Sequence, residues 1–320
     1  MKDKVKNYGQ YLTPHIVSNF MCALINKPSD SAILEPSAGE GIFLKNLANN
    51  GFTNLKAYEI DKTLVNNSEI NIKYLDFLST PTKEEYDVVI GNPPYVRWKN
   101  IDESIKEKLS NNHYWKDVVN GLSDLLYPFI YKSIDLLKEN GELIFITPRF
   151  WTKTQHSKEL RNHILKNGEL EYLILFNEMK IFKNVSSDIL IFKFNKKRTG
   201  NPIKIINALS KKSLNENHLK ELVEIINKLD FVDYLENKEF EAYNHEQFTS
   251  SNSWNPIPPK IRDKLKKIEE SSRNNSPKIE FKNNGSKIDY YLNSLLTNED
   301  LNNFNLSITS ALTVSLLANL

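Results

Sequence analysis

Short apolar runs alternate with helix-like patterns between residues 31 and about 194 of this chain. Each run has the length of a buried strand, and polar or glycine-containing segments separate the runs. Strands and helices in alternation are typical of parallel βαβ units, so the sequence predicts an α/β protein with a doubly wound, mostly parallel sheet. The predicted strands are Ser31–Glu35, Leu55–Ile60, Ile70–Leu75, Tyr86–Gly91, Gly141–Thr147, Leu170–Phe176 and Asp188–Phe194.

Two helices carry recognisable end signals. Thr13-Pro14 offers an N-cap followed by proline at the first helical position, which predicts a helix over His15–Leu24. Leu122–Glu139 places apolar residues at helical spacing, and Asn140-Gly141 predicts a helix stop before the next strand.

The alternating pattern ends at the polar run Asn195–Pro202, which is typical of a linker. We therefore predict a domain boundary after residue 197, with a catalytic domain over residues 1–197 and a second region over 198–320. This second region is rich in Asn, Lys, Ser and Glu and shows no repeat, so its composition predicts no particular fold. Five of the eight residues in Lys260–Lys267 are basic, which fits a solvated helix face better than a phosphate-binding patch.

Composition narrows the class of protein. The single cysteine, Cys22, excludes an internal disulfide and a cysteine-rich zinc site, and no metal site is expected. The sequence has neither an apolar run long enough to span a membrane nor a signal-peptide core, so a cytoplasmic protein is expected. The net charge of +2, from 42 basic and 40 acidic residues, does not by itself predict nucleic-acid binding.

Three predicted strand ends carry residues suited to a nucleoside ligand. Glu35–Gly41 leads from the first strand into a helix through Ser37 and Gly39, and such a turn lets the backbone approach a ligand closely. Glu59 ends the second strand, where doubly wound folds bind ribose hydroxyls. Asp76 offers an acceptor for an adenine amino group, and the neighbouring Phe77 offers a ring to lie against the base.

The same residues distinguish between cofactors. A glycine turn alone fits packing as well as ligand binding, but the acidic strand ends favour a cofactor site. The three-glycine dinucleotide fingerprint is absent, and the loop has no basic residue for a pyrophosphate. A phosphate-free nucleoside cofactor is therefore favoured, and S-adenosylmethionine meets that description.

The fourth strand runs directly into Asn92-Pro93-Pro94-Tyr95. The two prolines hold this loop extended and rigid at the edge of the sheet where ligands bind. The Asn92 side-chain oxygen and a backbone carbonyl can accept both hydrogens of a planar amino group, which frees its nitrogen lone pair. Tyr95 can stack against a base that has left the duplex. A proline-rich turn without chemistry is the alternative, and the three neighbouring strand ends favour catalysis.

In their order, these motifs resemble the adenine-specific amino-methyltransferases of bacterial restriction-modification systems, in the gamma arrangement. The resemblance covers residues 8 to about 194. It also rests on segments outside the loops already described, namely Tyr8–Pro14, Leu122–Leu125, Lys138–Leu143 and Ile181–Ser186.

The resemblance implies a Rossmann-like class I methyltransferase core that transfers a methyl group from S-adenosylmethionine to the 6-amino group of a flipped adenine in a specific DNA sequence. Asn92, Pro93, Pro94 and Tyr95 would form the catalytic loop, and Phe182 would pack against the adenine opposite Tyr95. Thr13 would contact the cofactor's carboxylate. The full set of cofactor-binding positions would be Tyr11, Thr13, Glu35, Ser37, Gly39, Glu59, Ile60, Asp76, Phe77 and Asn92.

The resemblance also implies partners. Double-stranded DNA would be the substrate, and a cognate restriction endonuclease would accompany the enzyme. Residues 198–320 would form a target-recognition region, although they are short for a complete one. Three alternatives stay open: an RNA adenine methyltransferase, a protein glutamine methyltransferase, and a non-catalytic DNA-binding subunit.

Overall fold

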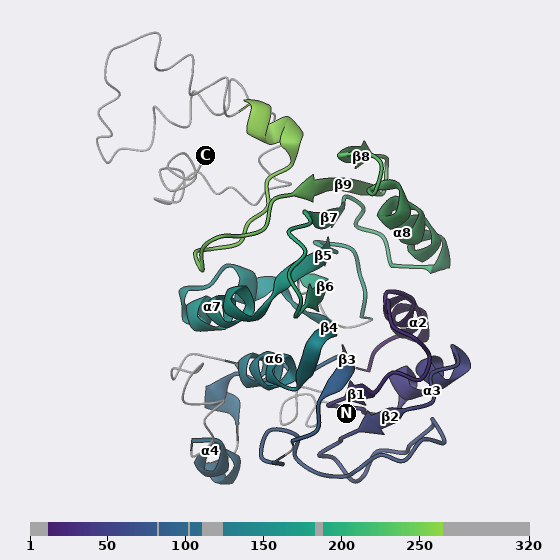
Figure 1. Cartoon of the computed structure of the whole chain (residues 1–320), viewed down its shortest axis with the longest axis vertical. Coiled ribbons are helices and arrows are strands. Elements are labelled where there is room, and N and C mark those ends of the chain that lie inside the picture. The colour runs from purple at the N-terminus through teal and green to yellow at the C-terminus, as the bar shows by residue number, and fades with distance from the viewer. Residues whose placement is uncertain (1–11, 82, 102, 111–123, 183–187, 265–320) are drawn as a thin grey trace. The chain divides into compact units, whose positions relative to one another are not determined.

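The computed structural model describes residues 12–81, 83–101, 103–110, 124–182 and 188–264 (Figure 1). Its α-helices are α2 His15–Ala23, α3 Ile42–Asn49, α4 Glu103–Ser110, α6 Leu126–Asp135, α7 Lys158–Asn167 and α8 Glu216–Lys228. Its strands are β1 Ile33–Glu35, β2 Leu55–Ala57, β3 Tyr86–Gly91, β4 Leu137–Pro148, β5 Glu169–Leu175, β6 Ile189–Asn195, β7 Ile203–Ala208, β8 Tyr234–Glu236 and β9 Phe240–His245. Short 3₁₀ turns follow at Trp98–Asn100, Arg149–Thr152 and Gln155–Ser157.

The strands form one sheet in the order β2-β1-β3-β4-β6-β5-β7-β9-β8. Strands β2, β1, β3 and β4 are parallel, β6 is antiparallel to both β4 and β5, and β5 is parallel to β7. Strand β9 is antiparallel to both β7 and β8. Only β6 and β9 of these nine strands therefore run against the rest, and the predicted mostly parallel α/β sheet is confirmed.

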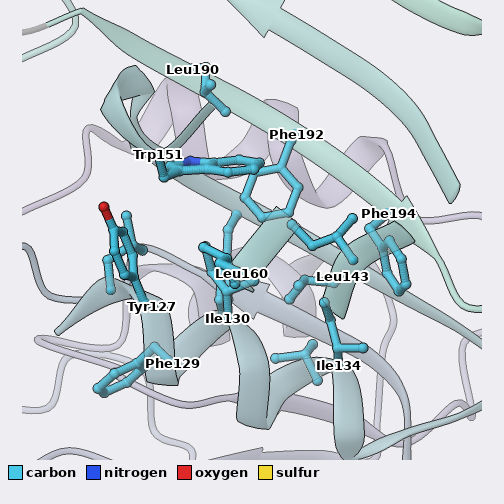
Figure 2. Packing of buried hydrophobic residues seen from close by; sticks show 14 of the residues in the cluster. Tyr127, Phe129, Ile130, Ile134, Leu143, Trp151, Leu160, Leu190, Phe192 and Phe194 are labelled. Carbon is cyan, nitrogen blue, oxygen red and sulfur yellow. The ribbon is translucent and has the colours of Figure 1, made fainter. Parts of the chain in front are cut away.

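Helices cover both faces of this sheet because its central strands are apolar on both sides. Val88 and Ile90 of β3 pack in a core with α2, α3 and α8, whereas Val89 packs in a second core with α6 and α7. Figure 2 shows the second core, where Phe192 and Trp151 lie above Ile130 and Leu160 of the helices. The doubly wound arrangement follows from this alternation.

The first helix begins at His15, as predicted, but its cap differs from the prediction. Pro14 occupies the N-cap position of α2, and no side chain caps the helix. The predicted role of Thr13 as N-cap is therefore wrong. Its hydroxyl accepts a hydrogen bond from Asn92 instead, which draws the start of α2 toward the end of β3.

Three other predicted elements differ from the structure. Helix α6 ends at Asp135, and β4 already begins at Leu137, so Asn140-Gly141 is not the helix stop. The predicted strand Ile70–Leu75 is reduced to a single parallel bridge between Tyr58 and Lys73. Strand β2 likewise ends at Ala57. The last two of these elements lie at the edge of the sheet, where alternating polar residues and few neighbours weaken strand pairing.

The predicted boundary after residue 197 does not coincide with a break in the fold. Strand β7 lies beyond that point and pairs in parallel with β5, because Ile203, Ile205 and Ile206 continue the buried apolar pattern. The chain divides instead into Met1–Asn255 and Pro256–Leu320. In the second unit the structure describes residues 256–264, which are helical from 259 onward. Within the described ranges, we find no helix that is both long and apolar enough to span a membrane.

Candidate active site

The carboxyl ends of β1 and β3 lie side by side, at the point where the chain order across the sheet changes direction. Glu35 is the last residue of β1, and Gly91 is the last residue of β3. A Cβ added at Gly91 would lie 3.7 Å from Cγ of Glu35. The two predicted loops therefore leave adjacent strands, and the Ser37 hydroxyl links them by donating to the Asn92 carbonyl oxygen at 3.1 Å.

The glycine loop adopts the left-handed backbone that its sequence suggests. Gly39 has φ 56° and Gly41 has φ 80° at the N-cap of α3. A Cβ at Gly41 would approach Ser68 to 2.8 Å, so a larger residue would displace the following segment. The backbone N–H of Gly39 donates to Oε2 of Glu59 at 2.7 Å.

Glu59 stands just beyond β2 and is almost fully buried. Its Oε1 accepts the backbone N–H of Asp61 at 2.9 Å, so both carboxylate oxygens are bound by backbone donors. Burial nevertheless raises the pKa of Glu59 above its ordinary value, against the lowering effect of these hydrogen bonds. Glu59 therefore orders the glycine loop, and its predicted contact with ribose hydroxyls stays a prediction.

Glu35 is 1% exposed. Burial, and then the charge of Glu59, raises the pKa of Glu35 well above its usual range. Among the described residues its Oε2 has no hydrogen-bond partner. A buried acceptor left in this state costs free energy, and a donor from a ligand would relieve that cost.

Asp76 forms a tight turn: its side chain accepts from the backbone N–H of Leu78 at 3.0 Å and from the Ser79 hydroxyl. Lys132 of α6 supports the turn from below, since its Nζ donates to the carbonyl oxygens of Phe77 and Thr80. Burial lowers the pKa of Lys132 to about 8. Sequence reasoning missed Lys132, because no local signal pairs it with a segment more than fifty residues away.

Phe77 has a buried ring. It is 2% exposed and packs between Tyr58 and Phe129, with ring centroids 6.0 and 5.2 Å away. The ring contributes to the core between the sheet and α6, and its contact with a cofactor base stays a prediction. The exposed apolar side chains here are Ile60 and Leu75, each two residues beyond the Tyr58–Lys73 bridge.

The Asn92–Tyr95 loop is held on two sides. Nδ2 of Asn92 donates to the Thr13 hydroxyl oxygen at 3.1 Å. The Tyr95 hydroxyl lies within hydrogen-bond distance of Oδ1 of Asn92 and 2.7 Å from the carbonyl oxygen of Ile146 in β4. The acceptor that the sequence assigns to catalysis is thus contacted by the hydroxyl of its own loop. Pro93 is buried and Pro94 half-buried, which keeps the loop against the sheet.

The segment after this loop is tied to α6 by Asp124. Asp124 pairs with Arg97 as an antiparallel bridge, and its Oδ1 accepts the backbone N–H of Leu126 at 3.0 Å. The Leu125 N–H donates to the Val96 carbonyl oxygen at 2.8 Å. Burial raises the pKa of Asp124 to about 6. The resemblance of Leu122–Leu125 to a family motif was its only signal in the sequence.

Two further predicted positions are Tyr11 and Phe182. Tyr11 lies outside the described residues, as do residues 183–186 of the segment Ile181–Ser186. Phe182 is 7% exposed and belongs to the core that contains α2 and α8. Its stacking opposite Tyr95 stays a prediction.

Comparison with solved structures defines the class of fold. A putative class I S-adenosylmethionine-dependent methyltransferase from Listeria monocytogenes is 19% identical, with a TM-score of 0.54 over 67% of this chain and 70% of its own. A modification subunit of a putative type I restriction enzyme from Vibrio vulnificus is 15% identical, with a TM-score of 0.60 over 79% of this chain and 61% of its own. The fold is that of the class I S-adenosylmethionine-dependent methyltransferases.

The family follows from sequence. Residues 24–182 match the model of the Eco57I restriction-modification methylases. The Type II methyltransferase M.HincII of Haemophilus influenzae is 39% identical over 84% of this chain and 50% of its own length. M.AccI of Acinetobacter calcoaceticus is 25% identical over 78% of this chain and 46% of its own. The chain belongs to the restriction-modification DNA methyltransferases, as its motifs predicted, and it spans about half the length of these relatives.

Proposed function

We propose that this chain transfers a methyl group from S-adenosylmethionine to the exocyclic 6-amino group of adenine in a specific DNA sequence. The observation that carries the proposal is the position of Asn92. Its amide lies at the carboxyl end of β3 and donates to Thr13, while its backbone carbonyl accepts from Ser37 of the glycine loop. The catalytic loop and the predicted cofactor loop therefore share hydrogen bonds.

The residues of this edge fit the proposed cofactor. Oε2 of buried Glu35, which has no hydrogen-bond partner among the described residues, suits a cationic amino group, and the Thr13 hydroxyl suits a carboxylate. Glu59 and Asp76 remain the candidates for the ribose hydroxyls and the adenine amino group. Ile60 offers the exposed apolar surface that Phe77 does not. The bound cofactor would supply an electrophilic methyl group.

The proposed chemistry uses the loop as a pair of acceptors. The hydrogen bond to Thr13 orients the Asn92 amide so that Oδ1 is the acceptor on its other side. The target amino group would take the place of the Tyr95 hydroxyl at Oδ1 and donate its second hydrogen to a loop carbonyl. These bonds would draw the nitrogen lone pair out of conjugation, and the nitrogen would lose a proton after methyl transfer. The Tyr95 and Phe182 rings would hold the base.

We extend the proposal to partners. Double-stranded DNA is the proposed substrate because the matching family model is that of the Eco57I restriction-modification methylases. One relative, from Escherichia coli, is named as both restriction enzyme and methyltransferase, which supports a cognate endonuclease as partner. Residues 198–320 remain the proposed target-recognition region, and β7, α8 and β9 in this range extend the catalytic sheet. We place the enzyme in the cytoplasm, where its DNA would be.

A methyl-transfer assay tests the function. The chain is incubated with labelled S-adenosylmethionine and either genomic DNA, RNA or a glutamine-containing protein, and modified positions in the DNA are sequenced. Label is expected in adenine of the DNA, at one recurring sequence. Label in RNA or protein, but not in DNA, would assign the loop to one of the alternative substrates. Cofactor and DNA binding with no transfer to any of the three would instead indicate a non-catalytic subunit.

A further inference from the structure

Two cations, Arg149 and Lys153, lie in the turn that follows β4, and the described residues pair them with a single carboxylate. Arg149 begins the turn after β4, three residues beyond Ile146, whose carbonyl oxygen contacts the Tyr95 hydroxyl. Three residues of extended chain span about 10 Å, so Arg149 lies within reach of a nucleotide held at Tyr95. Lys153 closes the same turn four residues later.

The Arg149 guanidinium is rigidly placed. Its side chain is 12% exposed and donates to Oδ1 of Asn177 at 3.2 Å and Oδ1 of Asn255 at 3.1 Å. Asn177 itself has the left-handed φ of 48°, and its Nδ2 is bound to the Ala208 carbonyl oxygen. Two of the three groups that hold Arg149 are therefore neutral amides, which fix its direction without neutralising its charge.

The charges at this turn do not balance. Asp188 is the one carboxylate that the described residues place in an ion pair with Arg149, at 3.6 Å, and it is 39% exposed. Lys153 is half-buried, and within the described ranges its ammonium has no hydrogen-bond or ion-pair partner. Burial and the neighbouring Arg149 charge lower the pKa of Lys153. Two like charges one turn apart disfavour folding, so an anionic ligand would stabilise them.

Hydrogen bonds from Arg161 also hold the turn after β4. Arg161 of α7 is 1% exposed, and its guanidinium donates to the carbonyl oxygens of Trp151 and Thr154 at 2.7 and 2.9 Å. Its Nε donates to the Ser251 carbonyl oxygen at 2.9 Å. Arg161 thus binds the backbone on either side of Lys153. This bracing pre-organises the turn rather than leaving it to adapt.

We propose that Arg149 and Lys153 form a binding site for DNA backbone phosphates that flank the target adenine. Arg149 and Lys153 carry two positive charges and Asp188 carries one negative charge, so one further negative charge would balance the group. A phosphodiester supplies a single negative charge shared between its oxygens. Phosphate contacts position a protein on DNA without reading its sequence. This inference rests on the proposed function, since it assigns the turn after β4 to the same substrate.

The salt dependence of DNA binding tests this site. Lys153→Gln removes one charge at a side chain without a partner in the described chain. Binding of a labelled duplex to the full chain is measured by fluorescence anisotropy over a series of salt concentrations. Loss of one phosphate contact should weaken binding several-fold at low salt and reduce the slope of log K against log salt by about 0.9. Affinity for S-adenosylmethionine should not change, which also shows that the variant folds.

Lys166→Gln is the matched control, because Lys166 is exposed in the last turn of α7, which leads into the opposite edge of the sheet. It makes the same change in net charge and should leave the slope near that of the wild type.

Three results would overturn the site: equal slopes for Lys153→Gln and wild type, equal effects of both substitutions, or no DNA binding by the wild type at low salt. Tighter binding of an RNA of the same sequence would assign it to RNA instead. A wild type that binds DNA with the expected slope but transfers no methyl group would refute the proposed function and leave this site standing.

Discussion

The two sides of the Asn92–Tyr95 loop carry different titratable groups, acidic on one side and basic on the other. On the side of β1 and β2, Glu35 and Glu59 are buried carboxyl groups. On the side of β4, Arg149 and Lys153 outnumber the one carboxylate that the described part of the chain pairs with them. The net charge of +2 sums over the whole chain, so composition alone did not indicate that acidic and basic groups lie on different sides of the loop. An edge divided in this way suits a cationic cofactor on one side and a polyanion on the other.

The two sides also differ in how their charges are held. Backbone N–H groups of Gly39 and Asp61 bind Glu59, so the acidic side depends on the conformation of a glycine loop. Side chains from three separate segments hold Arg149, so the basic side depends on how distant parts of the chain pack. Substitutions on the acidic side should therefore change cofactor binding, and those on the basic side should change DNA binding.

Asn92→Ala changes the loop that lies between the two sides, and it should have the largest effect on methyl transfer. It removes a preorganised acceptor for the target amino group, so methyl transfer should fall by about a hundredfold or more. Affinities for cofactor and DNA should stay within a few-fold of wild type. Single-turnover transfer and calorimetry measure the two quantities. Asn100→Ala, in the exposed turn that follows, is the control, and near-normal turnover in Asn92→Ala would remove the proposed mechanism.

Replacement of Glu59 and Asp76 by Ala should affect the acidic side alone. A hydrogen bond to a charged group contributes about 1.5–3 kcal/mol, so affinity for S-adenosylmethionine should fall roughly ten- to a hundredfold per residue. The salt slope of DNA binding should not change. Glu85→Ala, at the exposed residue just before β3, controls for loss of a negative charge. Calorimetry showing unchanged cofactor affinity in the double variant would show that these carboxylates are not in the site.

Tyr95→Ala and Phe182→Ala should affect the target base more than the cofactor. Aromatic contact with an extruded base contributes about 1–3 kcal/mol. With 2-aminopurine at the target position, fluorescence should rise on binding as the base unstacks, and either substitution should alter that signal. Tyr95→Phe keeps the ring and removes the hydroxyl that contacts Asn92, so it should retain the rise. Efficient methylation at the probe position without any rise would contradict base flipping.

Asp124→Asn should have the smallest effect, and one that appears only as pH changes. Burial raises the pKa of Asp124 from 3.8 to about 6, so between these values the folded state binds more protons than the unfolded state. The contribution of Asp124 to the free energy of unfolding of the wild type therefore falls as pH rises through that window. Asn keeps an acceptor for the Leu126 N–H and carries no charge. Its melting temperature should match wild type near pH 4 and exceed it by a few degrees at pH 7. A variant that loses stability at pH 7 would show that the charge of Asp124 is stabilising.

The central strands were predictable because they are apolar on both faces. Tyr86–Gly91 was predicted with its observed bounds, and Ile189–Asn195 was displaced by one residue. The edge was less predictable: Ile70–Leu75 has the composition of a strand but pairs only at Lys73. Strand β7 was missed because the polar run before it resembles a linker, whereas its pairing with β5 is a long-range contact. Local patterns identify a strand that is buried on both sides but not one whose neighbour decides its pairing.

The candidate site divides in the same way. The sequence by itself determined the chemistry of its loops, because two prolines and two glycines limit backbone conformation locally and Asn92 brings its own acceptor wherever the chain folds. Only the tertiary structure decided the environment of the charged groups. It buried Phe77 beneath α6, set Lys132 under the carbonyl oxygens of a turn more than fifty residues away, and brought Asn177, Asp188 and Asn255 around Arg149. Such contacts join residues far apart in the chain, and burial changes the charge state of a side chain in ways that its neighbours in sequence do not reveal.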